Sequence, residues 1–422
     1  MKKYAVAITL IILGVQISRA QMGDILKRKA AEGVKQGSQT GTEKALDKGI
    51  DRLFRKKDKN NRAAVDTTGR QPVQNASGNG QDPALQTFGK YDFIPGEKIL
   101  GFDDFSQDAV GDFPGKWATN ASGELMTTDK YSGKWLNISK QGFYLPSFIK
   151  SLPVNFTIEY EIIFIPPASA SGPNTAQVGL QVIHAAAGKP AFDYNLPRSY
   201  FELDPYMGQV NIGGYSNSGE KILTNEFQVK GIERSKSFRY HVAVWRQQGR
   251  LRVYLDERKV VDAPSLLSPD IIYNGIRLST SLNNDGSTWL IGNFKFAAGL
   301  PDTRNKLLNE GKFSTTGILF DVNSAIIRAE SYGTLKDIAT VLKENAPLQV
   351  KIVGHTDSDG DKATNLDLSR RRAEAVKAAL VREFSVEEGR LQTDGRGQEQ
   401  PVSANSSPAG KAQNRRVEFI KL

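Results

Sequence analysis

The sequence predicts a multidomain protein in which an antiparallel β-sandwich is followed by an α+β domain. Two observations support this prediction. Between residues 91 and 300, apolar and polar residues alternate with no helical stripe between the alternating runs, whereas after residue 313 strand and helix periodicities take turns. The length of 422 residues suits two or three domains. We place the sandwich at 91–300 and the α+β domain at 313–422.

The strands of the predicted sandwich are recognised by their two-residue period. In the longest run, one face is predicted to be buried and the other to face solvent: Val154, Phe156, Ile158, Tyr160, Ile162 and Phe164 alternate with Asn155, Thr157, Glu159 and Glu161. A second run, 238–244, is followed by a turn at 247–250 and a third run, 251–255, which predicts a hairpin. Further strands are expected near 276–282 and 289–296.

The predicted α+β domain has a strand at 317–322, a helix at 329–344, a strand before residue 354, a second helix after it, and closing strands at 391–397 and 416–422. The first helix carries one apolar stripe, which should be buried: Tyr332, Leu335, Ile338, Ala339 and Leu342. We expect both helices on one side of the sheet.

The first twenty residues have the pattern of a secretory signal peptide. Lys2 and Lys3 precede an apolar run that is short for a membrane span, and Ser18 and Ala20 offer small residues for cleavage before Gln21. A membrane anchor is the alternative. The protein is therefore expected to be exported, to the periplasm or in association with the outer membrane.

Two further segments precede the sandwich. Residues 21–57 form a basic segment with an amphipathic pattern, and 22–57 would suit an anionic membrane surface. A solvated basic tail is the alternative. Residues 58–90 are rich in Asn, Gly, Ser, Gln and Asp, and have too little apolar surface to offset the entropy of ordering, so they predict a disordered linker.

Composition excludes several classes of function. The chain has no cysteine, which removes disulfides, thiolate metal sites and a lipid-modified cysteine. The formal net charge of +10 favours anionic partners, but no nucleic-acid-binding motif is present and export argues against such a partner. No cofactor is predicted. The run from Asp357 to Asp361 lacks the glycine and glutamate spacing of a calcium loop, so no metal is predicted either.

The candidate binding site lies at 354–373, where a strand, a polar loop and a helix follow one another. Asp357 is in the loop, and Asn365, Leu368 and Arg372 are three and four residues apart, on one helix face. A guanidinium near a carboxylate, with a small apolar floor between them, would bind a ligand that carries both an ammonium and a carboxylate. An ion pair that only ties the loop to the helix is the alternative.

Residues 313–422 resemble the OmpA-like peptidoglycan-binding domain of Gram-negative envelope proteins. The matching motifs are Phe320-Asp321, Gly354-His355-Thr356-Asp357, Asn365-x-x-Leu368-Ser369-x-x-Arg372-Ala373 and Asn414-Arg415-Arg416-Val417-Glu418. The resemblance implies that Asp357 and Arg372 bind the diaminopimelate of the peptidoglycan stem peptide. We further expect that Thr356, Asn365 and Asp321 help hold the loop or the peptide and that Leu368 floors the pocket. Arg415 and Arg416 are expected to be mainly structural and to tie the last strand to the loops.

The sandwich resembles the concanavalin-type, laminin-G-like jelly roll in its opening segment, 105–117, and in the hairpin 252–261. Its partner would be a glycan or an envelope protein. Aromatic residues that could stack on sugars are Tyr194, Tyr200, Tyr206, Tyr215 and Trp245, with rim or core packing as the alternative.

We therefore expect a non-enzymatic envelope protein that links the wall to the outer membrane or to an envelope partner. The alternative is a carbohydrate-active enzyme whose sandwich hydrolyses a polysaccharide with Glu202 and Asp204. The jelly-roll hydrolases add a third carboxylate shortly downstream, and this chain lacks it.

Overall fold

The computed structural model describes residues 91–167, 176–186, 191–281, 286–299 and 302–422. The chain divides into two compact units, Met1–Leu85 and Gln86–Leu422, and all described residues belong to the second unit. The predicted signal peptide (1–20), basic segment (21–57) and linker (58–90) lie outside the described residues.

Most of the described chain before residue 300, here called the β domain, is folded into two antiparallel sheets. Sheet A has eight strands within the described residues, in the order β13-β12-β11-β6-β15-β4-β3, with β1 also paired to β15. Its strands are β1 (Lys98–Asp103), β3 (Glu124–Met126), β4 (Trp135–Asn137), β6 (Asn155–Ile165), β11 (Phe238–Gln247), β12 (Arg250–Leu255), β13 (Arg258–Ala263) and β15 (Thr288–Ala298).

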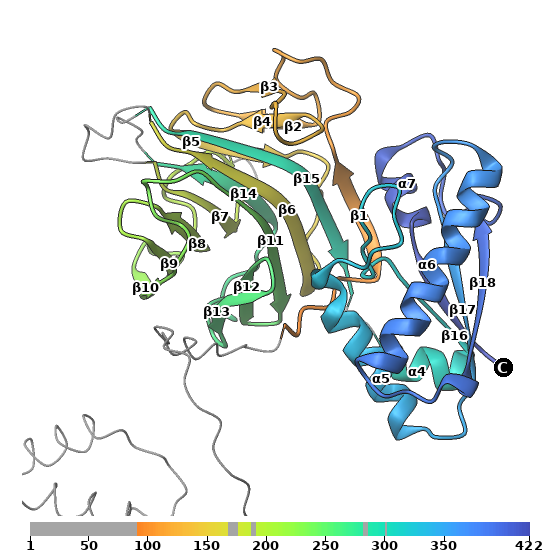
Figure 1. Ribbon diagram of the computed structural model, residues 1–422. Coiled ribbons are helices and arrows are strands. Elements are labelled where there is room, and N and C mark those ends of the chain that lie inside the picture. The colour runs from red at the N-terminus through yellow and green to blue at the C-terminus, as the bar shows by residue number, and fades with distance from the viewer. Residues whose placement is uncertain (1–90, 168–175, 187–190, 282–285, 300–301) are drawn as a thin grey trace, which may run out of the picture. The chain divides into compact units, whose positions relative to one another are not determined.

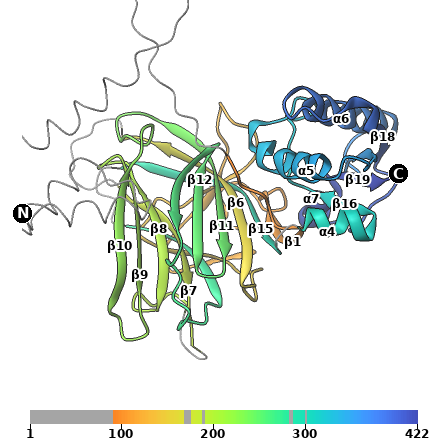
Figure 2. The same ribbon diagram turned by 90° about the horizontal axis from the view of Figure 1, so that it is seen from below.

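Sheet B has seven strands within the described residues, in the order β10-β9-β8-β7-β14-β5-β2. Figures 1 and 2 show β7, β8 and β9 in one layer and β6, β11 and β15 in the other. The strands are β2 (Trp117–Thr119), β5 (Gly142–Pro146), β7 (Val178–Ile183), β8 (Arg198–Asp204), β9 (Gln209–Tyr215), β10 (Lys221–Gln228) and β14 (Gly275–Thr280).

The two sheets share one hydrophobic core. The predicted alternation along β6 is confirmed on its inner face, where Phe156, Ile158, Tyr160, Ile162 and Phe164 are buried against residues of sheet B such as Leu180 and Phe201. Val154, predicted to be buried with them, was predicted wrongly: it precedes the strand and is 58% exposed. The predicted hairpin is confirmed as well, because Gln247 pairs with Arg250 across a two-residue turn.

The outer face of β6 differs from the prediction. Glu159 and Glu161 were expected to be solvated, but each is only 4% exposed. They are buried because charged partners from β11 and β15 lie beside them: His241 lies between the two carboxylates and Lys295 pairs with Glu159. Alternation along one strand cannot reveal partners that arrive from other strands.

The C-terminal domain combines a sheet with helices. Within the described residues, its sheet has four strands in the order β16-β19-β17-β18, and only β17 and β18 run parallel. The strands are β16 (Lys312–Thr315), β17 (Val350–His355), β18 (Leu391–Gly397) and β19 (Val417–Lys421). The helices are α4 (Thr303–Asn305), η2 (Lys306–Glu310), η3 (Ala329–Ser331), α5 (Tyr332–Glu344), α6 (Lys362–Arg382), η4 (Glu388–Arg390) and α7 (Pro408–Asn414).

Helices α5 and α6 bury their apolar stripes against this sheet in one cluster. Four of the five predicted stripe residues of α5 are buried, namely Leu335, Ile338, Ala339 and Leu342. The fifth, Tyr332, is 37% exposed and was predicted wrongly. None of the helices in the described ranges is long and apolar enough to cross a membrane.

The predicted strand at 317–322 was also wrong. The strand that pairs with β19 lies earlier, at Lys312–Thr315, and the later stretch contributes only an isolated bridge between Phe320 and Ile327. Close packing explains the difference, because a Cβ on Gly317 would clash with Pro95 and Thr334. The chain at this point therefore packs against other segments instead of extending the sheet.

Within the second unit, the β domain and the C-terminal domain make direct contacts. The backbone N–H of Ile99 in β1 donates to Gln413 Oε1 in α7 over 3.0 Å, and Lys306 Nζ lies 2.5 Å from Glu97 Oε2. In addition, a Cβ on Gly333 would clash with the carbonyl oxygen of Phe93. Sheet A and the C-terminal domain therefore meet near β1 and α7.

Candidate peptide-binding site

The candidate site is built where β17 ends and α6 begins. Helix α6 lies directly on the sheet, since a Cβ on Gly354 would clash with the backbone of Ser369, and one on Gly395 with that of Arg370. The helix begins after Asp361, whose side chain accepts a hydrogen bond from the backbone N–H of Thr364 over 2.9 Å. These contacts fix the loop 356–361 against the first turns of α6.

Asp357 is almost completely buried in this loop, with 8% of the residue exposed. Its Oδ2 lies 2.5 Å from Nη1 of Arg415, and its Oδ1 accepts a hydrogen bond from the backbone N–H of Asp359 over 3.1 Å. The direct partner of the Asp357 carboxylate is therefore Arg415, which follows α7, and this guanidinium was predicted to be mainly structural. The sequence showed two adjacent arginines there, but not which one reaches the loop.

Arg372 on α6 is held by main-chain groups. Its Nε donates to the carbonyl oxygen of Ser324 over 2.9 Å, its Nη2 lies 3.4 Å from the carbonyl oxygen of Asp321, and its guanidinium lies 4.8 Å from the ring centre of Phe320. Within the described residues, it has no carboxylate within ion-pair distance. Burial lowers its pKa, the positive charge of Arg415 lowers it further, and Asp357 opposes both effects. Arg372 therefore lies in the field of both Asp357 and Arg415 and lacks a paired anion.

The other residues predicted for the site lie near Asp357 or Arg372. Most of their contacts hold the loop 356–361 in place. Asn365, 6% exposed, donates to the carbonyl oxygen of Asp359 over 2.9 Å and to Gln398 Oε1 over 2.8 Å. Thr356 is 5% exposed and donates to the carbonyl oxygen of Asp357 over 2.8 Å. Leu368 is buried, whereas Asp321 is exposed and contributes its main chain to Arg372.

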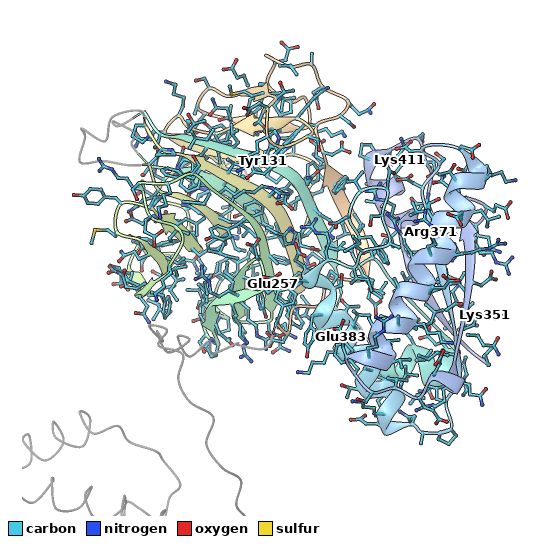
Figure 3. The ribbon with its side chains drawn as sticks, viewed as in Figure 1. Tyr131, Glu257, Lys351, Arg371, Glu383 and Lys411 are labelled. Carbon is cyan, nitrogen blue, oxygen red and sulfur yellow. The ribbon has the colours of Figure 1, made fainter. Side chains whose placement is uncertain are left out.

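Two acidic residues next to the pocket have internal partners. The sequence suggested that Asp359 and Asp361 add negative charge there. However, Asp359 Oδ1 lies 2.6 Å from Nζ of Lys411 on α7 (Lys411 is labelled in Figure 3), and Asp361 caps α6. All three carboxylates of this loop therefore have partners within the chain, since Asp357 pairs with Arg415.

A cavity of about 260 Å³ opens beside these groups. On the side of the C-terminal domain it is lined by Phe320, His355, Arg372 and Arg415, among others. The opposite wall comes from sheet A. The arrangement offers two guanidinium groups to an anion, with a buried carboxylate close behind one of them, which is the chemistry that binds a zwitterion.

Glu202 and Asp204, the carboxylates of the alternative hydrolase site in the β domain, have different surroundings. Burial raises the pKa of Glu202 to about 7, whereas Asp204 accepts hydrogen bonds from Gln177 Nε2 over 2.6 Å and from the backbone N–H of Met207 over 3.0 Å. Within the described ranges, no group of three or more His, Asp or Glu residues could hold a metal ion.

The aromatic candidates of the β domain are divided between surface and core. Tyr194 and Tyr206 are 53% and 51% exposed. The rings of Tyr200 on β8 and Tyr215 on β9 stack against each other. Trp245 is only 6% exposed, because it packs in a small cluster with Phe93 and neighbouring aromatic residues. Its predicted role in sugar stacking was therefore wrong.

Comparisons with known proteins place the C-terminal domain in a family. The model of the OmpA family matches residues 319–415, so this part of the chain is an OmpA family domain. The chain is 42% identical over 102 residues to the probable lipoprotein YiaD of Escherichia coli strain K12, a match that covers 24% of this chain and 46% of that protein. It is 41% identical over 101 residues to outer membrane porin F of Pseudomonas aeruginosa, covering 24% of this chain and 29% of the porin.

The chain thus spans less than half the length of these two relatives. Among solved structures, the peptidoglycan-associated lipoprotein from Burkholderia pseudomallei is 30% identical, with 29% of this chain and 100% of that chain covered and a TM-score of 0.25. The cell wall anchor of the T6SS from Pseudomonas aeruginosa is 33% identical, with 26% and 80% covered and a TM-score of 0.24.

Proposed function

We propose that this chain binds peptidoglycan non-covalently through its C-terminal domain and thereby holds an envelope structure to the wall. The ligand is the diaminopimelate of the stem peptide, which ends in an ammonium and a carboxylate. The observation that carries the proposal is the state of Arg372, a partly buried guanidinium beside a cavity, near Asp357 and without a carboxylate partner of its own.

Arg372 and Asp357 each bind one charged group of the ligand. The carboxylate of diaminopimelate pairs with Arg372, whose main-chain partners Ser324 and Asp321 hold its Nε and Nη2 in place. The ammonium binds Asp357, which then shares its carboxylate between the ligand and Arg415. Thr356 and Asn365 keep the loop in shape and Leu368 supports it from below.

The comparisons support this function. The relatives of the OmpA family domain include an outer membrane porin and lipoproteins, one of them named for its association with peptidoglycan. We therefore place the protein in the periplasm, associated with the outer membrane. Residues 22–57 would contact an anionic membrane surface, because they are rich in lysine and arginine.

The β domain has a separate role in this proposal. Its two facing antiparallel sheets fit a jelly-roll sandwich, and we assign it the recognition of a glycan or an envelope protein without catalysis. One argument against hydrolysis is that both carboxylate oxygens of Asp204 accept hydrogen bonds within the chain, from Gln177 Nε2 and from the backbone N–H of Met207.

A pull-down with purified peptidoglycan tests the proposal. The wild-type chain should sediment with the wall, and Arg372→Ala should lose at least about tenfold in affinity, because a charge-assisted hydrogen bond contributes roughly 1.5–3 kcal/mol. The matched control is Arg371→Ala on the same helix, whose guanidinium is exposed and pairs with Asp367 over 2.8 Å (Figure 3). Equal sedimentation of the two variants would overturn the site.

A further inference from the structure

The cavity beside Arg372 has a second wall, contributed by the outer face of sheet A. This wall is lined by Glu159 and Glu161 on β6, His241 on β11, and Asn293 and Lys295 on β15. The cavity thus lies between side chains that are more than 100 residues apart in the sequence.

The charges of this wall are already compensated among themselves. Lys295 Nζ lies 2.8 Å from Glu159, and His241 lies 3.4 Å from Glu159 and 3.2 Å from Glu161. Arg239 completes the group at 3.0 Å from Glu161. Sheet A therefore does not supply the anion that Arg372 lacks, and the unmatched positive charge in the cavity calls for an anionic ligand.

Asn293 is the polar residue of this wall that is free to bind. It lies at the irregularity of β15 between Gly292 and Lys295, in a left-handed conformation with a φ of 51°. Its side chain is exposed and makes no hydrogen bond in the part of the chain that the structure describes. Bulges redirect side chains, and asparagine adopts the left-handed conformation readily.

His355, on the wall formed by the C-terminal domain, is a second residue that a ligand would contact. The residue is 3% exposed, and neither ring nitrogen has a hydrogen-bond partner within the described residues, although Nε2 lies 3.5 Å from Glu418. Burying a polar group without a partner is unfavourable, and a ligand in the cavity would supply that partner. His355 and Asn293 line the same cavity, one from each wall.

We propose that sheet A forms the second wall of the stem-peptide site, where the side chain of Asn293 binds the peptide through a hydrogen bond. The inference rests on the function proposed above. The cavity, about 260 Å³, has room for one amino-acid end of a peptide.

Binding of a soluble muropeptide to the full chain, measured by calorimetry, tests this inference. The probe is an uncrosslinked monomer with a free diaminopimelate end, and the wild-type chain should bind it.

A variant of the second wall sharpens the test. Asn293→Gly keeps the left-handed backbone but removes the amide, and it should weaken monomer binding about threefold to tenfold, as expected for one neutral hydrogen bond. The matched control is Gln248→Gly, another residue with a positive φ (54°), in the turn between β11 and β12 and outside the cavity lining. An unchanged affinity in Asn293→Gly would contradict the role of sheet A. If the chain bound neither muropeptides nor whole peptidoglycan, the proposed function itself would fall.

Discussion

The guanidinium of Arg415 lies 2.5 Å from the carboxylate of Asp357, and this pair joins the end of α7 to the loop that precedes α6. The carboxylate that the sequence assigned to a ligand is thus paired with a guanidinium of the chain itself. The cation expected to face it, Arg372, is instead held by the carbonyl oxygens of Ser324 and Asp321. The two arginines therefore have different tasks, which variants can separate.

Arg415→Ala should weaken wall binding less than Arg372→Ala does. Arg415 positions Asp357, and its side chain is 43% exposed, so water can replace part of its contact. We expect a loss of about threefold to fivefold, against tenfold or more for Arg372→Ala, in the same sedimentation assay. A larger loss for Arg415→Ala than for Arg372→Ala would mean that the roles of the two arginines are reversed.

His241 should make the stability of the β domain dependent on pH in the alkaline range. Burial alone would lower its pKa, but hydrogen bonds to Glu159 and Glu161 outweigh that effect and raise the pKa to about 9. The folded state therefore holds a proton that the unfolded state, with a pKa near 6.5, loses first. The stabilisation is complete below pH 6.5 and is lost as the pH rises through 9.

Thermal unfolding between pH 6.5 and 9.5 measures this effect. The melting temperature of the wild type should fall by a few degrees more than that of His241→Gln, since a few degrees correspond to about 1 kcal/mol in a domain of this size. The same slope in the wild type and in His241→Gln would show that the buried cluster does not titrate in this range.

Glu202 should have the opposite pH dependence, because burial raises the pKa of its carboxyl to about 7. The folded state binds this proton more tightly than the unfolded state, so stability is lost as the pH rises from about 4.5 to 7. Glu202→Gln should therefore stabilise the chain by about 1–2 kcal/mol at pH 8 and leave it unchanged at pH 4. Glu226→Gln, exposed on β10, serves as the control in chemical denaturation at both pH values. A stabilisation by Glu202→Gln that does not depend on pH would contradict this explanation.

Gly354 should be essential for seating α6 on the sheet. An added methyl group would clash with the backbone of Ser369, which cannot move without shifting the helix that carries Arg372. Gly354→Ala should destabilise the C-terminal domain by about 1–3 kcal/mol, the usual range for overpacked cores. Gly389→Ala, where a methyl group would meet open space, should change its unfolding midpoint little. Similar midpoints for the two variants would indicate that α6 is seated by other contacts.

Local periodicity predicted much of the fold. Alternation along β6 and β11 located those strands and their inner faces, and the spacing of Asn365, Leu368 and Arg372 placed the site on one face of α6. These signals lie within one element, so a single sequence contains them.

What the sequence missed depends on contacts between distant elements. The partner of Asp357 is 58 residues away, at Arg415, and the burial of Glu159 depends on Lys295 and His241 from other strands. The cavity needs both domains. No periodicity encodes such contacts, because each is set by tertiary packing.

The most direct test of the central claim compares two kinds of stem peptide. Diaminopimelate carries the second carboxylate that Arg372 is proposed to bind, whereas lysine at the same position has only the ammonium. The full chain should bind a soluble diaminopimelate stem peptide at least about tenfold more tightly than its lysine counterpart, because one charge-assisted contact is lost. Equal affinity for the two peptides, measured by calorimetry, would contradict the account.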